Sequence, residues 1–396
     1  MVRGEPNLSI EGVFRRHMRR PAVGIVGVGA AGFGPALPEI STRELMFEAA
    51  ALAYRDAGID PRMEVDSFIT TSEDQWEGWS ITDEMVPDQL GGAGRPVCTI
   101  PGDGLTGLGN AVMQIESGVA EVVALEAHSK ASDVIDKEAV EDLAQEPSIV
   151  RPLGMGSDTL AALEMGAFLE ASGFGLADCD LVIENSRKRG RSNPLASFGS
   201  KKRRGVSPSS KVISSPLRMA DKARHADAAI VVVLASKRWA RKNEMGVVSV
   251  DGISWCSSLP WFDGGEAGFA GYARSSFERA ARQAKLKRGL RSFDLVELDD
   301  TYSFKLLQHL VSLARDKDEA SRVLGGQGQA LNPSGGSLAV GNLLEASALH
   351  RLYEAVLQLR GEAGRRQVKG AKSALVQSWR GVPTATGGVA ILSVGA

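Results

Sequence analysis

A cysteine and the start of a helix lie close together in residues 97–118, which read VCTIPGDGLTGLGNAVMQIESG. Apolar residues spaced three and four apart predict a helix over 105–117 that ends at Gly118. A helix N-terminus lowers the pKa of a thiol through its dipole and its free N–H groups, so a cysteine at such a position can act as a nucleophile. Cys98 lies three residues before Pro101, ahead of this helix, so it is a candidate catalytic nucleophile only if the intervening loop shifts it to the helix start, and Cys256 is a weaker candidate.

Cys98 also fits a buried position on a strand, and we favour this second interpretation. The run PVCTI is typical of a strand, and a free cysteine packs as a small apolar side chain. No basic partner that would activate the thiol is evident around Cys98. Asp103 fits the N-cap of the following helix better than a catalytic role.

Two adjacent carboxylates, Asp299 and Asp300, end the predicted strand FDLVELDD at 293–300. Adjacent carboxylates can separate their pKa values, which suits acid–base catalysis. Neighbouring residues on a strand point to opposite faces, so we expect only one of the pair to face a site. Asn342 could serve as a hydrogen-bond donor there. The alternative, that Asp299 and Asn342 only fill a pocket with polar groups and water, is favoured over catalysis.

A basic segment over 187–211 carries nine Lys or Arg residues and no acidic residue. The first interpretation is a solvated loop, and an anion-binding site is the second. Nucleic-acid binding ranks last, because Phe198 is the only aromatic residue in this segment and bases would have few aromatic side chains to stack on.

The stretch GVGAAG at 27–32 matches the dinucleotide-binding pattern G-x-G-x-x-G after a predicted strand. That site requires a helix to begin at the last glycine, and here FGPALPEIS follows with two prolines. A dinucleotide site is therefore not expected. We expect these glycines to form the turn after the first strand.

Composition sets broad limits on the class of protein. The 396 residues are 43% hydrophobic and 24% charged with a formal net charge of −2, which is ordinary for a globular protein and gives no general attraction to nucleic acid or anionic membrane. Three widely spaced cysteines and no C-x-x-C motif argue against disulfides and structural zinc, and no metal site is expected. No apolar run approaches the roughly 20 residues that span a bilayer. A cytoplasmic location without membrane attachment is expected.

Predicted elements repeat along the chain. Each half reads strand, helix, strand, helix, strand, strand, which predicts buried sheets covered by helices. The region 129–216 interrupts the first half and shows one helical stretch near 158–172. The predicted organisation is an N-terminal extension over 1–21, a first half over 22–128 plus 217–245, an insertion over 129–216 and a second half over 246–396.

Several blocks, in this order and spacing, resemble the thiolase superfamily, and most of all the archaeal and sterol-carrier-type acetyl-CoA acetyltransferases. These blocks are IESG, LEAHSKASD, SNPLASF, SSPLRMADKARHADAAIVVVLAS, FDLVELDDTYSF, LNPSGGSLAVGN and GGVAILSV. The resemblance runs from about residue 22 to the end. It implies an α/β thiolase fold: two repeated halves in a five-layered αβαβα core with an insertion subdomain.

Members of this superfamily transfer acyl groups through a helix-start cysteine, two His or Asn groups that hold the thioester oxygen, and a second cysteine near the C-terminus. The resemblance places the nucleophile on or beside Pro101, Gly102 or Asp103, none of which is a thiol. Asp299 and Asn342 occupy the positions of the oxygen-holding amide and the catalytic histidine. The C-terminal segment SWRGVPTATGG has neither Cys nor His. Because a carboxylate at 299 would repel a developing oxyanion, ordinary thiolase chemistry is not supported.

The resemblance therefore leads to three hypotheses about function. The first is a degenerate acyl-CoA-binding or scaffold subunit of acyl-CoA metabolism, and the second is an acyltransferase using Cys98, or a non-covalent acyl-CoA reaction using Asp299 and Asn342. The third is a purely structural interaction protein. Coenzyme A or acyl-CoA would be a ligand rather than a tightly bound cofactor. In this family the insertion contributes to the coenzyme A site, so the basic segment is a candidate for its phosphates, through Lys201, Lys202, Arg203 and Arg204.

The family also implies a homodimer or homotetramer, joined through the first half where 97–104 would lie. An OB-fold/zinc-ribbon protein and a condensing enzyme are further partners by analogy.

Overall fold

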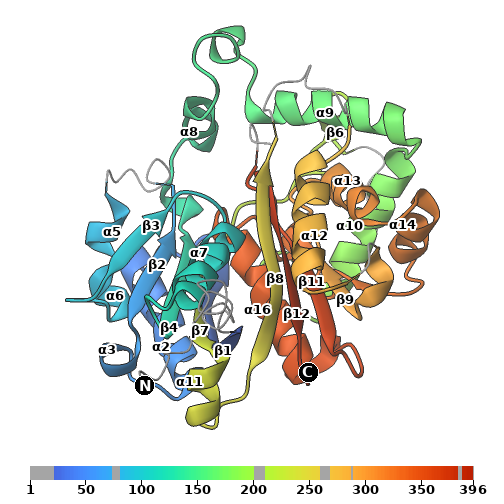
Figure 1. The fold of residues 1–396 in the computed structure, drawn as a ribbon. Helices are drawn as coiled ribbons and strands as arrows, with labels where there is room; N and C mark the ends of the chain where they lie inside the picture. Colours follow the sequence, from blue (N-terminus) through green and yellow to red (C-terminus); the bar gives the residue numbers. More distant parts are fainter. Residues whose placement is uncertain are drawn as a thin grey trace, which may run out of the picture.

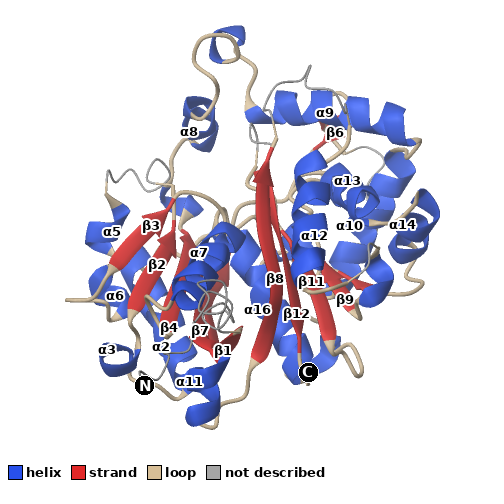
Figure 2. Cartoon of the chain, in the orientation of Figure 1, coloured by secondary structure: helices blue, strands red, loops and turns tan. Residues whose placement is uncertain are grey.

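The two halves of the chain form sheets of the same topology (Figures 1 and 2). The computed structural model describes residues 22–73, 81–199, 210–258, 268–286, 289–381 and 386–395. If the five strands of each half are numbered along the chain, both halves have the order 3-2-4-5-1. The first half contains β1 (Val23–Gly34), β2 (Ser67–Thr71), β3 (Val97–Ile100), β4 (Val122–Ser129) and β7 (Asp227–Ser236). The second contains β8 (Val248–Ser257), β9 (Leu295–Glu297), β10 (Ala330–Leu331), β11 (Ser373–Gln377) and β12 (Thr386–Ser393).

Strand directions repeat as well as strand order. In the first half β2 pairs in parallel with β3 and β4, and the pairs β4–β7 and β7–β1 are antiparallel. The second half repeats this with β9 between β10 and β11, followed by β12 and β8. Hydrogen bonding between β1 and β8 joins the halves into one ten-stranded sheet. The predicted twofold repeat is confirmed.

Helices separate and cover the two half-sheets, giving five layers. Between the half-sheets lie α7 (Gly104–Ser117) and α16 (Ala346–Arg360), each in contact with strands of both halves. The outer face of the first half is covered by α2 (Thr42–Ala57), and that of the second by α12 (Gly271–Gln283) and α13 (Ser303–Leu313). Three apolar clusters fill the spaces between these layers. The observed layers are those of the expected αβαβα core.

The central helix α7 follows from the sequence pattern that predicted it. On α7 the apolar side chains at 105, 108, 112 and 115 are buried, and Gly118 ends the helix in the left-handed conformation with φ 78°. Gly104 at its start is needed for close packing, because a Cβ there would lie 2.5 Å from Cγ of Leu349 on α16. The two central helices therefore meet at the first residue of α7.

One expectation about the glycines of β1 is wrong. The segment 27–32 is not a turn, because β1 continues through it to Gly34 and pairs with β7. Side chains at these positions would clash with α2: a Cβ on Gly27 would lie 2.6 Å from the Ala53 carbonyl oxygen, and one on Gly29 would lie 2.2 Å from that of Ala49. The glycines therefore let the outer helix pack directly on the strand.

The insertion contains more helix than the sequence predicted. It forms α8 (Lys137–Leu143), the expected α9 (Ser157–Ser172), the unexpected α10 (Leu176–Gly190) and a small hairpin of β5 (Val212–Ser214) and β6 (Leu217–Arg218). Although the insertion interrupts the first half, α9 and α10 pack on helices of the second half. A buried lysine of α13, Lys305, contributes to this contact with its Nζ 2.6 Å from Oε1 of Glu164 on α9.

The remaining described elements are short, and most connect the larger ones. The α-helices are α3 (Pro61–Glu64), α5 (Thr82–Met85), α6 (Pro87–Leu90), α11 (Lys237–Lys242), α14 (Lys317–Leu324) and α15 (Gly336–Val340), and the 3₁₀ turns are η1 (Ala131–Asp133), η2 (Arg151–Leu153), η3 (Leu290–Ser292) and η4 (Gly364–Arg366). Within the described residues no single helix is long and apolar enough to cross a membrane; α9 and α10, bent by 111° relative to each other, are so only as a pair and only by length and composition.

Candidate functional site

The start of α7 carries a carboxylate where the family resemblance puts a thiolate. Asp103 is the N-cap, and its Oδ1 accepts hydrogen bonds from the backbone N–H groups of Leu105 (2.9 Å) and Thr106 (3.0 Å). Burial raises the pKa of Asp103, while hydrogen bonds, first that from Ser378, oppose the shift. The N–H groups that would stabilise a thiolate or an oxyanion at this helix start are thus already bonded to a side chain of the protein.

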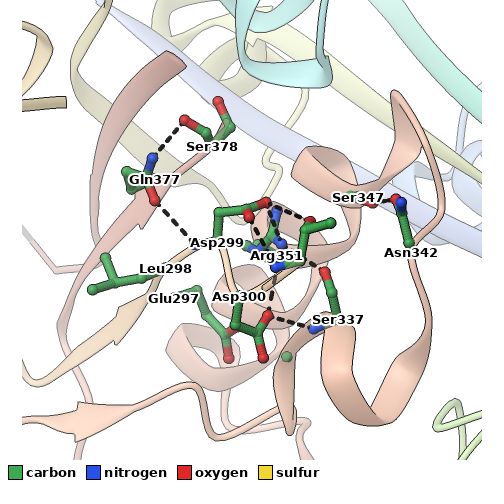
Figure 3. A network of polar contacts seen from close by, with 12 residues as sticks. Glu297, Leu298, Asp299, Asp300, Ser337, Asn342, Ser347, Arg351, Gln377 and Ser378 are labelled. Carbon is green, nitrogen blue, oxygen red and sulfur yellow. Dashed lines mark hydrogen bonds and ion pairs between the residues drawn. The ribbon is translucent and has the colours of Figure 1, made fainter. Parts of the chain in front are cut away.

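A buried chain of hydrogen bonds leads from the end of β11 to the loop of Asp299, which follows β9 (Figure 3). The Gln377 side chain donates to the Ser378 carbonyl oxygen (2.6 Å) and accepts from the Asp299 backbone N–H (2.9 Å). Ser378 in turn accepts a hydrogen bond from the N–H of Gly388 on β12 (3.1 Å). The first residue of the C-terminal segment and the Asp299 loop are therefore held together through one glutamine.

Asp299 is paired with a buried arginine and is closed off from solvent. Its Oδ2 lies 2.7 Å from Nη2 of Arg351 on α16, and its Oδ1 accepts from the backbone N–H of Thr301 (3.0 Å). The exposed fraction of each of the two paired side chains is 1%. A base must reach the proton that it removes, so this geometry does not support Asp299 as a general base.

The expectation that Asp299 and Asp300 point to opposite faces is wrong. Nη2 of Arg351 is 2.7 Å from Asp299 and 3.8 Å from Asp300, so both carboxylates face one guanidinium (Figure 3). The alternation of a strand does not apply because β9 already ends at Glu297. Burial raises the pKa of Asp300 to about 6, and burial next to Glu354 raises that of Glu297 to about 8.

Asn342 stabilises the local turn. Its Oδ1 accepts hydrogen bonds from the Leu344 backbone N–H (3.1 Å) and the Ser347 hydroxyl (3.4 Å). Its backbone pairs with the segment that leads into β7, through the Arg224 carbonyl oxygen (2.8 Å) and the Ala226 N–H (3.0 Å). In Figure 3, Asn342 and Ser347 lie to one side of the Arg351 cluster. Its role in this structure is to shape the loop ahead of α16.

Cys98 lies away from the start of α7. It is on the edge strand β3, half-buried, with Sγ 3.8 Å from the Phe68 carbonyl oxygen and 4.0 Å from Nε2 of Gln114. Gln114 is ten residues along α7 from Gly104, which corresponds to about 15 Å of helix. Burial raises the pKa of the Cys98 thiol. The structure thus brings Cys98 together with the distal part of α7 rather than with Asp299 or Asn342.

The predicted coenzyme A contacts Lys201, Lys202, Arg203 and Arg204 lie outside the described residues. Phe198 precedes them in the chain, and the centroid of its ring lies 3.8 Å from the guanidinium carbon of Arg224. Among the described residues, no group of three or more His, Cys, Asp or Glu side chains is arranged to hold a metal ion.

Several polar residues of the site were not singled out from the sequence. They are the buried cation Arg351, the bridging Gln377, and a cluster of Glu141, Asp158, Lys222, His225 and Tyr302. Arg351 gives only a weak local signal, because it lies off the face of α16 that carries Leu349, Leu352, Val356 and Leu359 and is enclosed only because nearly all sides of this helix are buried. The cluster gives none, since its members come from four separate segments.

Comparisons with known proteins agree with this architecture. The family described as "Thiolase C-terminal domain-like" matches residues 270–394. The acetyl-CoA acetyltransferase of Methanothermobacter thermautotrophicus is 26% identical over 387 residues, which are 94% of this chain and 98% of that protein.

Solved structures show the same fold. The "Ltp2-ChsH2(DUF35) aldolase" superposes with a TM-score of 0.78 at 22% identity, covering 94% of this chain and 98% of that one. A monomeric SCP2-thiolase-like protein type 1 from Mycobacterium smegmatis superposes with a TM-score of 0.72 at 19% identity, covering 95% and 77%. Residues 270–394 thus match the thiolase C-terminal domain-like family, and the whole chain has the repeated five-layered thiolase fold and is similar to an acetyl-CoA acetyltransferase over nearly its full length.

Proposed function

We propose that this protein binds acyl-CoA without forming a covalent acyl-enzyme, and acts as a binding or scaffold subunit of acyl-CoA metabolism. The observation that carries the proposal is the start of α7, where the Asp103 carboxylate occupies the N–H groups of Leu105 and Thr106. A helix start used in this way cannot also activate a thiolate. The similarity to an acetyl-CoA acetyltransferase over nearly the whole chain supports the ligand class.

The geometry argues against the alternative of a displaced nucleophile. Cys98 is a neutral thiol whose pKa burial raises, and it lies on the edge strand beside Gln114. Its described contacts are a backbone carbonyl oxygen and an amide, neither of which is a base able to take its proton.

A second candidate function is a carbon–carbon reaction on a CoA thioester that needs no acyl-enzyme. One solved structure of this fold is named as an aldolase, and its TM-score of 0.78 exceeds the 0.72 of the SCP2-thiolase-like protein. The buried pair of Asp299 with Arg351 is an obstacle to the version that uses Asp299 as base. That version would require another group to move the proton.

The proposal includes the basic segment and an assembly. Lys201, Lys202, Arg203 and Arg204 would hold the phosphates of coenzyme A, which would bind reversibly. The assembly would be at least a homodimer, and the fold's occurrence with a DUF35 protein in one solved structure supports a partner subunit. Light scattering on the purified chain measures the mass of the assembly, and a monomer would contradict this part of the proposal.

Two measurements test the main proposal. The first is intact-protein mass after incubation with acetyl-CoA and acetoacetyl-CoA, run beside Cys98→Ser; we expect no added acyl mass on either protein. An adduct that Cys98→Ser removes would show that the nucleophile has moved to Cys98.

The second measurement is calorimetric titration with acetyl-CoA. We expect reversible binding, weakened about tenfold when Lys201, Lys202, Arg203 and Arg204 are all replaced by Gln, since each exposed ion pair contributes up to about 1 kcal/mol. Absence of any binding would overturn the proposal and leave the purely structural interaction protein.

A further inference from the structure

A cluster of five polar side chains lies where the insertion meets the two halves. We call it the junction cluster: Glu141 of α8, Asp158 of α9, Lys222 and His225 of the segment before β7, and Tyr302 at the start of α13. None of the five was predicted from the sequence to take part in a site. They come together only because the insertion folds over the second half.

Backbone pairing places this cluster beside two loops of the second half, the one that follows Asp299 and the one that contains Asn342. Lys222 forms an antiparallel bridge with Tyr302, and the Ala223 N–H donates to the Thr301 carbonyl oxygen (2.8 Å). Three residues later, His225 forms a parallel bridge with Asn342. The segment 222–225 thus connects the loop that follows Asp299 to the loop of Asn342.

Side-chain contacts divide the cluster into two parts. Oδ1 of Asp158 accepts a hydrogen bond from the Tyr302 hydroxyl (3.0 Å) and pairs with Nζ of Lys222 (2.7 Å). Nε2 of His225 lies 3.9 Å from Oε1 of Glu141. In the first part, Asp158 holds the Lys222 ammonium in place. In the second part, the His225 imidazole lies next to the Glu141 carboxylate.

Four of the five side chains of the junction cluster are partly exposed to solvent, whereas the Asp299–Arg351 pair is closed off from it. The exposed fractions of the Lys222, Asp158, Glu141 and His225 side chains are 22%, 19%, 17% and 16%, against 1% for Asp299. A group that exchanges protons with a ligand must be reachable by it. Of the two polar clusters, the junction cluster meets this requirement.

Glu141 and His225 have shifted pKa values that suit them to different roles in proton transfer. Burial raises the pKa of Glu141, so its carboxylate accepts a proton more readily than a surface glutamate does. Burial, followed by the charges of Lys222 and Lys137, lowers the pKa of His225 to about 4 and leaves the imidazole neutral at pH 7. A carboxylate with a raised pKa beside a neutral imidazole is an arrangement that enzymes use to remove a proton next to a carbonyl group.

We propose that Glu141 and His225 form a proton-transfer site for acyl-CoA thioesters. The inference rests on the proposed binding of acyl-CoA. Glu141 takes the proton from the carbon next to the thioester carbonyl, and the electron pair of that C–H bond moves to the thioester oxygen as an enolate. His225 donates a hydrogen bond to this oxygen, and the Lys222 ammonium stabilises its charge. Return of the proton from Glu141 to the carbon restores the thioester, so the step needs no oxidant or reductant.

Deuterium exchange tests this step without a second substrate. The full chain is incubated in D₂O with acetyl-CoA, and separately with butyryl-CoA, and incorporation next to the carbonyl is followed by mass spectrometry. We expect exchange with the unmodified protein, a loss of about 100-fold or more in Glu141→Gln and in His225→Gln, and partial activity in Glu141→Asp. Glu138→Gln is the matched control, because Glu138 is an exposed carboxylate of the same helix; it should keep most of the exchange, since its charge is the smallest of the named causes of the raised Glu141 pKa.

Binding of acetyl-CoA is measured on the same proteins by calorimetry, with circular dichroism to confirm folding. Binding without exchange in the unmodified protein, or exchange that survives Glu141→Gln, would overturn the proton-transfer site and leave the proposed binding function intact. Absence of binding would overturn the binding function and this inference with it. Binding retained in a Glu141→Gln variant that no longer exchanges is the result expected of a catalytic residue.

Discussion

The guanidinium of Arg351 lies 2.7 Å from the Asp299 carboxylate, and both side chains are buried between the central helix α16 and the end of β9. Asp300 faces the same guanidinium at 3.8 Å. One cation thus compensates two adjacent carboxylates in a place where the family resemblance puts catalytic groups. The pair is part of the protein interior, and it explains how a carboxylate can stand at position 299.

Replacement of Arg351 by Met should strongly destabilise the fold. It leaves two carboxylates buried without their cation, which costs about 3–5 kcal/mol in the free energy of unfolding. Urea denaturation followed by circular dichroism measures the loss. Adding Asp299→Asn to Arg351→Met should recover part of it, because one uncompensated charge is removed. Equal stability of the single and double variants would contradict this account of the pair.

Asp103→Ala tests whether the carboxylate at the start of α7 is structural. As an N-cap it should contribute about 1 kcal/mol, with Asp103→Asn losing much less because the amide oxygen can still accept both hydrogen bonds. Ser41→Ala at the capped start of α2 is the matched control and should lose a similar amount. A more stable Asp103→Ala protein would indicate instead that the charge is kept for function at the expense of stability.

His350 predicts a defined pH dependence of stability. Burial, together with the charges of Arg351 and Arg366, lowers its pKa from 6.5 to about 3. Between pH 3 and pH 6.5, His350 binds a proton in the unfolded chain but not in the folded protein. The contribution of neutral His350 to the free energy of unfolding is therefore fully present above pH 6.5 and is lost as the pH falls below it. The stability of the unmodified protein relative to His350→Gln should drop by up to about 1.4 kcal/mol per pH unit below 6.5. Urea unfolding at pH 7.5, 6 and 5 measures it, and a constant difference would contradict it.

The cysteine thiols should react slowly and in a definite order. Burial raises the pKa of Cys98, and it raises that of Cys179 on α10 to about 12. Because the thiolate is the reactive form, iodoacetamide at pH 8 should modify glutathione first, Cys98 more slowly and Cys179 slowest. Peptide mass spectrometry over time gives the three rates. A Cys98 that reacts faster than glutathione would indicate an activated nucleophile.

Local patterns in the sequence were enough to predict much of the fold. The buried face of α7, its end at Gly118 and the Asp103 cap all depend on residues within a few positions of one another. Such signals can be read along the chain because helix periodicity and capping are local. The repeated order of elements then specified the two halves.

Two of the wrong expectations concern places where a local pattern was overruled by packing. The glycines at 27–32 suggested a turn, but contact with α2 on one side and pairing with β7 on the other keep them in β1. Asp299 and Asp300 were expected on opposite faces, but the strand ends before them and Arg351 draws both to one side.

The sequence by itself determined the two α/β halves, their central helices and the absence of a thiol at the start of α7. Only the tertiary structure decided what replaces the expected chemistry: which cation pairs with Asp299, and that Glu141 of the insertion meets His225. Asp299 and Arg351 are 52 residues apart in the chain, and Glu141 and His225 are 84 apart. Contacts at such separations depend on strand order and on which surface the insertion covers, and neither leaves a periodic pattern in the sequence.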